Sequence, residues 1–283
     1  MSTPRHAALQ RFKRNPTAMA GLLFLLAVAT LALIAPLLYP GDPLAMEAEP
    51  LLWPGQDWQY PLGTDALGRD LMAGIVHGGR VSLQVGVLAS LFGVLLGLSI
   101  GALAGYFGGR IDYALQRLIE IFQTMPSFVL LVALVAIAQP SVPTLIFAIA
   151  IISWPTVARL VRAEVRSIRE REYILAARSV GYSHLRIIVR EVLPNILPTL
   201  IVTASIMVAS AVLMESALSF MGLGDPNQVS WGSLIGSGRE QIRTAWYLTA
   251  IPGLAIFFTV LAFNLIGDGL TDAFNPTQAQ GRR

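Results

Sequence analysis

The amino-acid sequence predicts an all-α membrane protein with six membrane-spanning helices. Hydrophobic residues make up 54% of its 283 positions and charged residues only 13%, about half of the roughly 25% that is usual in soluble domains. The mean hydropathy is +0.63. Apolar runs recur that are long enough to cross a hydrocarbon core of roughly 30 Å. The predicted spans are residues 18–38, 81–107, 118–138, 142–158, 196–216 and 245–267.

The first predicted span follows a basic N-terminal segment, residues 1–17. Its uncharged stretch of 21 residues is longer than the apolar region of a typical signal peptide, and no small-x-small cleavage site follows it. We therefore expect an uncleaved membrane anchor. The chain has no cysteine, so disulfides and thiolate chemistry are excluded.

The basic residues are distributed unevenly between the two sides of the predicted bundle. If the N-terminus is cytoplasmic, the segments on that side hold 16 of the 20 lysines and arginines. Such a bias predicts orientation by the positive-inside rule, with both termini cytoplasmic. The sequence pI of about 9.5 thus indicates topology rather than a nucleic-acid partner.

Three segments are expected outside the bilayer at appreciable length. Residues 39–80 and 217–244 should face outward, and the charged segment 159–194 should face the cytoplasm, as should residues 268–283. Each is too short for a separate globular domain.

A stripe of glycines runs along the second predicted span. Small residues at such a spacing let two helix backbones approach closely within lipid. The partner could be a helix of the same chain or of a second subunit. The stripe consists of Gly93, Gly97, Gly101, Gly105 and Gly109.

The charged segment 159–194 predicts two short helices joined by a turn. Gly181 stands where a left-handed residue would end the first helix, and Ser183 can cap the second. Pro194 should end that second helix. An apolar stripe at i, i+3, i+4 and i+7 is expected at Leu185, Ile188, Val189 and Val192.

Two roles suit these helices. They could lie on anionic lipid as an amphipathic surface, or they could bind a cytoplasmic protein. Ala176 and Ala177 leave a smooth surface that could fit a groove, and acids such as Glu172 and Glu191 would be repelled by anionic lipid.

The stretch LAARSVGYSHLRIIVREVLP resembles the EAA loop of permeases from ATP-binding cassette (ABC) importers. Leu175 stands where that pattern has Glu, and Glu191 where it has Ile. In that family the loop is a coupling helix that seats in a cleft of a cytoplasmic ATPase, which implies rim contacts for Glu172 and Arg178. The positions in register are Ala176, Ala177, Gly181, Leu193 and Pro194.

Longer blocks resemble the C-type permease of dipeptide, oligopeptide and nickel importers. They cover residues 61–86, 105–130, 217–235 and 252–276. The resemblance implies the type I permease fold in a bacterial inner membrane. It also implies a second permease subunit, two cytoplasmic ATPases and an extracytoplasmic substrate-binding protein. Short peptides are the expected substrate, with nickel, glutathione and oligosaccharides as alternatives within the family.

The sequence carries no nucleotide site of its own. A P-loop needs Gly-x4-Gly-Lys-Ser/Thr, and the only lysine is Lys13. We therefore expect no enzymatic activity and no cofactor in this chain, with ATP and Mg²⁺ on partner subunits. The three histidines, His6, His77 and His184, show no metal-binding spacing.

Two acids near span ends are candidates for a translocation pathway or gate, because carboxylates are costly inside a bilayer. Glu120 has Arg117 one helical turn away, which suggests a local ion pair. Glu215 has no local partner in sequence, and it could line a pathway or accept hydrogen bonds from loop backbone. Outside the second span, Asp65, Arg69 and Asp70 could form a folded loop packed on the bundle, or they could contact an external substrate-binding protein or the other permease.

Two other classes of function are weighed against transport driven by a separate ATPase. One is a membrane scaffold whose charged segment binds another cytoplasmic protein. The other is a secondary transporter, which would favour inverted repeats and ionisable pairs near midplane. No clear repeat is present, and the acids lie near span ends.

Overall fold

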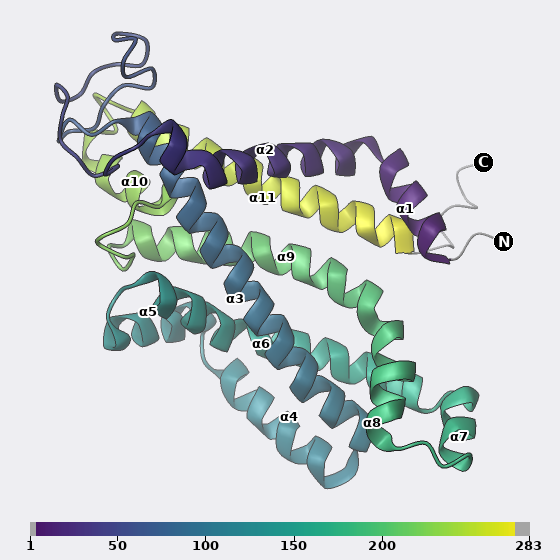
Figure 1. The fold of residues 1–283 in the computed structure, drawn as a ribbon. Coiled ribbons are helices and arrows are strands. Elements are labelled where there is room, and N and C mark those ends of the chain that lie inside the picture. The colour runs from purple at the N-terminus through teal and green to yellow at the C-terminus, as the bar shows by residue number, and fades with distance from the viewer. Residues whose placement is uncertain (1–3, 275–283) are drawn as a thin grey trace.

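The computed structural model describes residues 4–274, and nearly all of the regular structure in this range is helical (Figure 1). The first six helices are α1 (Pro4–Arg14), α2 (Pro16–Leu38), α3 (Leu71–Phe107), α4 (Gly109–Thr124), α5 (Ser127–Ala138) and α6 (Val142–Arg169). They are followed by α7 (Glu172–Ser179), α8 (His184–Ile187), the π-helical turn η1 (Ile188–Val192), α9 (Leu193–Phe220), α10 (Trp231–Gly238), the 3₁₀ turn η2 (Arg239–Gln241) and α11 (Tyr247–Phe274).

Five helices are long and apolar enough to cross a membrane, and a bent pair is a sixth candidate. The five are α2, α3, α6, α11 and the continuous helix His184–Phe220, which contains α8, η1 and α9. The bent pair is α4 with α5, whose axes differ by 85°. The expected all-α membrane fold is confirmed.

The predicted span 118–138 is not one straight helix. α4 ends at Thr124, Met125 is extended with ψ 137°, and α5 begins at Ser127. Pro126 explains the break, because its ring disfavours a helical conformation in the preceding residue. The sequence does carry a sign of this break, because Gln123, Thr124, Pro126 and Ser127 interrupt the apolar run of the predicted span.

The helices form a bundle whose two ends differ (Figure 1). Residues 39–70 and α10 lie at one end, which we call the loop end. α1, α7 and the last turn of α11 lie at the other, which we call the terminal end. α2 packs beside α11, α9 packs against α11 and α3, and α3 crosses the bundle to pack along α6.

Four glycines of the predicted stripe lie directly against α6 of the same chain. A β-carbon at Gly97 would lie 2.6 Å from Cβ of Val157, and one at Gly105 would lie 2.7 Å from the carbonyl oxygen of Arg162. Gly101 meets α6 in the same way, whereas Gly93 lies less tightly between Ser153 of α6, at 3.3 Å, and Met207 of α9, at 3.2 Å. The absence of side chains therefore brings the backbones of α3 and α6 together.

Gly109 does not belong to this stripe, contrary to the prediction. α3 ends at Phe107, and Gly109 is the first residue of α4 with φ +56°. No atom outside its immediate neighbours lies within 4 Å of the position its β-carbon would take. Its spacing matched the stripe, but it serves the tight connection between α3 and α4.

We predict that Gly101→Ala destabilises the protein and that Gly253→Ala does not. The new methyl at position 101 would lie 2.5 Å from the carbonyl oxygen of Ala158, whereas the site at Gly253 in α11 is open. Overpacking should lower the free energy of unfolding by about 1–3 kcal/mol, while alanine at 253 should leave it unchanged or raised by up to about 1 kcal/mol. Thermal unfolding of both variants in one detergent measures the difference. Equal melting temperatures would contradict the packing described.

Candidate functional site

The short helix α7 projects from the terminal end of the bundle (Figure 1). Only Ile174 of α7 is fully buried, and it joins a core cluster with residues of α3, α6 and α9. Around it the surface is exposed and partly apolar, with Val180 75% and Leu185 72% exposed. One buried anchor therefore holds an otherwise open helix against the bundle.

The residues predicted for a coupling surface fall into two groups. Glu172, Ala176, Arg178 and Gly181 are exposed on α7 and the turn after it, and Ala177 is half-buried beside them. Leu193 and Pro194 lie apart from these residues, in the first turn of α9. Pro194 there lines an apolar cavity between α1, α9 and α11.

Gly181 adopts the left-handed conformation that the sequence predicts, with φ +85°. Its N–H donates to the carbonyl of Arg178 at 2.9 Å, and the N–H of Tyr182 donates to that of Ala177 at 3.1 Å. The space around its missing β-carbon is open. The backbone angle, not crowding, is the reason for glycine here.

The predicted apolar stripe of the second short helix is wrong. Ile187 and Val192 are fully buried, while Leu185 and Val189 are exposed. The π-helical turn η1 separates the buried residues by five positions, and its closing bond runs from the N–H of Leu193 to the carbonyl of Ile188. A π turn rotates the following residues to a new face, so a 3.6-residue period does not describe this segment.

Pro194 does not end the helix either, because the chain continues from α8 through η1 into α9. Proline lacks the N–H that an α-helix would direct to residue 190, and the wider η1 turn precedes it. The Asn195 side chain donates to the carbonyl of Glu191 at 2.5 Å and to the hydroxyl of Tyr173 at 3.3 Å. Asn195 thus connects the start of α9 to α7.

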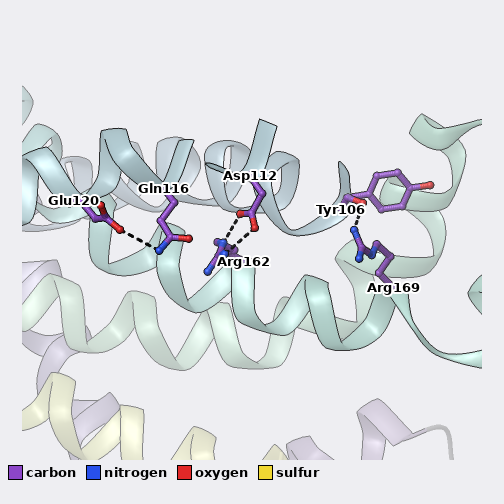
Figure 2. Close-up of polar contacts among 6 residues, drawn as sticks. All are labelled: Tyr106, Asp112, Gln116, Glu120, Arg162 and Arg169. Atoms are coloured by element: carbon purple, nitrogen blue, oxygen red, sulfur yellow. Dashed lines mark hydrogen bonds and ion pairs between the residues drawn. The ribbon is translucent and has the colours of Figure 1, made fainter. Parts of the chain in front are cut away.

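Tyr106 joins the end of α3 to the projecting segment. Its hydroxyl lies 3.0 Å from Nδ1 of His184, and the guanidinium of Arg178 lies 5.1 Å from its ring centroid. Its carbonyl accepts a hydrogen bond of 3.2 Å from Nη1 of Arg169 (Figure 2). Tyr106 is only 2% exposed, so α6, α7 and α8 all meet at one buried residue.

Figure 2 also shows how α4 is fixed to α6. The guanidinium of Arg162 contacts both carboxylate oxygens of Asp112, with Nη2 to Oδ2 at 2.7 Å. Such paired bonds set the relative orientation of two helices as well as their distance.

Glu120 forms the local pair that the sequence suggests. Nη1 of Arg117 lies 2.7 Å from its carboxylate, and the Gln116 amide donates to it at 3.1 Å (Figure 2). The Glu120 side chain is 41% exposed. An open pair of this kind is screened by solvent and contributes little to stability.

Glu215 is fully buried among serines. Its carboxyl group accepts hydrogen bonds from Ser82 of α3 at 2.8 Å and from Ser219 of α9 at 2.7 Å, with a longer one of 3.4 Å from Ser216. The Ser82 hydroxyl in turn accepts the backbone N–H of Trp231, at the start of α10, at 3.3 Å. The donors to Glu215 are thus serine hydroxyls of α3 and α9 rather than the loop backbone that the sequence suggested, and they tie these two helices together.

The acids before α3 are used within the loop-end structure. Asp70 caps α3 by accepting the N–H of Met72 at 2.8 Å, and Asp65 accepts the N–H of Arg69 at 2.9 Å. Partial burial raises the pKa of the Asp70 carboxyl, against the opposing effect of its backbone hydrogen bonds. These contacts favour the folded-loop alternative.

We predict that Glu215→Leu destabilises the protein far more than Glu120→Leu. The first change leaves the hydroxyls of Ser82 and Ser219 without their acceptor, and each such buried group costs about 1–3 kcal/mol. The second removes only an exposed, solvent-screened pair, which contributes little to stability. Glu215→Gln keeps one carbonyl acceptor and should lose less than Glu215→Leu. Thermal unfolding measures all three, and equal losses for Glu215→Leu and Glu120→Leu would contradict the buried tie.

Comparison with known proteins identifies the fold and the family. Residues 97–280 match the family described as binding-protein-dependent transport system inner membrane component. Residues 3–59 match the N-terminal TM domain of oligopeptide transport permease C.

Relatives align along nearly the whole chain. The di/tripeptide transport system permease protein DppC of Pseudomonas aeruginosa is 41% identical over 273 residues, which cover 94% of this chain and 90% of the relative. The dipeptide permease DppC of Alkalihalophilus pseudofirmus is 38% identical, with 97% and 90% covered. The glutathione transport system permease GsiD of Escherichia coli is 36% identical, with 97% and 91% covered.

Solved structures share the fold. A chain of the MetNI methionine ABC transporter in an inward-facing conformation superposes with a TM-score of 0.60 at 20% identity, over 72% of this chain and 98% of that one. A chain of an amino acid ABC transporter gives a TM-score of 0.52 at 22% identity, over 70% and 92%.

The helical bundle and its projecting helix are therefore those of a membrane subunit of a transport system. The chain belongs to the family of inner membrane components of binding-protein-dependent transport systems, the permeases of bacterial ABC importers. It is a non-catalytic subunit, because ATP hydrolysis in this family takes place on separate subunits. The resemblance read from the sequence is confirmed, and membership of this family leaves no support for the scaffold and secondary-transporter alternatives.

Sequence reasoning missed Tyr106 and the serines around Glu215. Tyr106 and His184 are 78 positions apart, and Ser82 and Glu215 are 133 apart. Apolar periodicity carries no information about such distant pairs, and a tyrosine at the end of an apolar span is unremarkable by itself.

Proposed function

We propose that this chain forms one half of the membrane pathway of an importer for short peptides. Its close relatives are named as di/tripeptide and dipeptide permeases, and the glutathione permease among them also handles a peptide. The other half is a second permease subunit, as the sequence resemblance implies. ATP and Mg²⁺ bind to two partner ATPases, and this chain needs no cofactor.

The observation that carries the proposal is the exposed α7 surface at the terminal end. One buried residue anchors it, and Glu172, Ala176 and Arg178 are left open around a smooth face. These residues occupy the positions of the coupling motif that the sequence resembles. In our proposal α7 seats in a cleft of the ATPase, and Glu172 and Arg178 contact its rim.

The charge distribution supports a cytoplasmic position for this end of the bundle. The segments 1–17 and 159–194 carry most of the chain's basic residues, which favours the cytoplasmic side. Both termini are then cytoplasmic, and the loop end faces the extracytoplasmic binding protein.

Movement of α7 has two routes into the bundle. Tyr106 connects Arg178 and His184 to the end of α3, and α3 is packed backbone to backbone on α6. Asn195 connects Tyr173 to the start of α9. When ATP binding draws the ATPases together, a displaced α7 pulls on both routes, and the bundle changes the side on which it is open.

Purification of the tagged chain from its native membrane in mild detergent tests the proposal. We expect a P-loop ATPase, a second permease and a binding protein to be recovered, and uptake of a labelled dipeptide to require the intact chain. Recovery of the chain alone, under conditions in which a related importer stays assembled, would contradict the proposal. Uptake of nickel or an oligosaccharide instead of dipeptide would keep the permease role and overturn the peptide substrate.

We predict that Gly181→Trp removes the ATPase from the purified complex, while Gly222→Trp does not. Both glycines have left-handed backbones, φ +85° and φ +82°, and both lie in open space. The strain of the substitution is therefore matched, but only the indole at 181 projects beside the proposed docking face. Quantitative mass spectrometry of the complex should show at least a tenfold loss of ATPase for Gly181→Trp. Equal retention in both variants would place the docking face elsewhere.

A further inference from the structure

Trp58 is the most exposed large apolar side chain of the described residues, with 100% of its surface accessible. It lies in the loop-end segment between α2 and α3 (Figure 1). A single exposed apolar residue is common on proteins. The surroundings of Trp58 are what distinguish it from such a residue.

The segment that presents Trp58 is ordered by its own hydrogen bonds. The N–H of Gly55 donates to the carbonyl of Pro61 at 3.1 Å and closes the loop. Within it, Asp57 accepts the N–H of Gln59 at 2.9 Å through its side chain and that of Tyr60 at 3.2 Å through its carbonyl. The backbone on both sides of Trp58 is therefore held in one conformation.

The loop is also attached to the helical bundle. The hydroxyl of Tyr247, in α11, donates to the carbonyls of Leu52 at 2.8 Å and Thr64 at 3.1 Å. Thr64 is fully buried, and its hydroxyl donates to the carbonyl of Glu49 at 2.5 Å. A rigid mount of this kind lowers the entropy that a binding surface loses when it meets a partner.

Trp58 lies beyond the apolar band of the bundle. α3 begins at Leu71, and its first ten residues, which measure about 15 Å, include His77 and Arg80 before the uncharged run that starts at 81. The loop extends past the ends of the helices (Figure 1). This position differs from that of tryptophans in an interfacial belt, which lie at the level of the lipid headgroups.

The surroundings of Trp58 are acidic. Residues 39–80 contain six acids and two arginines. Asp42, Glu47 and Asp70 line a cavity of about 270 Å³ that also includes Gln59 and Tyr60, close to Trp58 in sequence. Acidic side chains disfavour anionic lipid and favour a basic protein surface.

We propose that the Trp58 loop, residues 53–62, is a docking surface for the extracytoplasmic binding protein on which this family depends. Trp58 fills an apolar pocket of that protein, and lysines or arginines around the pocket face the acids of residues 39–80. Rigid tryptophans at the centre of an interface are frequent binding hot spots. The inference rests on the proposed function, because it requires the loop end to be extracytoplasmic.

Binding of the co-purified binding protein to the complex in nanodiscs tests this surface. We expect Trp58→Ala to raise the dissociation constant at least about tenfold, as for a hot-spot residue, and Trp58→Phe to raise it less. Leu37→Ala is the matched control, since Leu37 is 82% exposed but lies in the apolar helix α2, and it should leave the constant unchanged. An unchanged constant for Trp58→Ala would overturn the inference.

Two further measurements separate the possible failures. The Trp58→Ala complex should retain as much ATPase as the complex of the parent chain. If the parent chain itself binds no ATPase, the proposed function fails, and this inference fails with it. A spin label on Gln59→Cys, in a chain that has no other cysteine, reports the loop's surroundings. Easy collision with a water-soluble nickel complex supports the docking surface, whereas preferential collision with oxygen would place the loop in lipid and overturn it.

Discussion

The backbone contact between α3 and α6 is the constraint on which the rest of the structure depends. Because lipid is as apolar as the side chains themselves, there is little hydrophobic driving force between helices in a membrane. Close packing must therefore hold the helices together. Glycines at 97, 101 and 105 allow α6 to lie against the α3 backbone. With that pair fixed, Arg169 at the end of α6 reaches the carbonyl of Tyr106 at the end of α3, and the position of α7 follows.

The connections to α7 differ in stiffness. Tyr106 is buried and leads into the tightly packed α3–α6 pair. Asn195 leads into α9 beside a π-helical turn and a proline, and sharp kinks in helices occur mostly at such features. If α7 is displaced as proposed, α3 and α6 should move with it as one body, while α9 bends at its first turn.

Most of the fold could be predicted from the sequence, because apolar run length and glycine spacing depend directly on the bilayer and on helix geometry. One error concerns Gly109, which has the spacing of the glycine stripe but begins α4, and two others lie at prolines. Pro126 breaks the segment 118–138, whereas Pro194 is accommodated without ending its helix. Whether a proline breaks a helix depends on how neighbouring residues pack around it, and the local sequence pattern does not show that packing. The same limit applies to the candidate site, where Gly181 follows from turn chemistry but Tyr106 and Ser82 act through residues far away in sequence.

α3 runs from the loop end of the bundle to the terminal end and connects the two proposed binding surfaces. Its 37 residues measure about 55 Å. At its first turn Asp70 caps the helix where the segment that carries the Trp58 loop ends, and Ser82 ties it to Glu215 and α10. Near its last turn Tyr106 holds the segment that contains α7. If both ends bind partners as proposed, the partners act on one stiff helix, and thermodynamic linkage requires that each alters the binding of the other by the same factor.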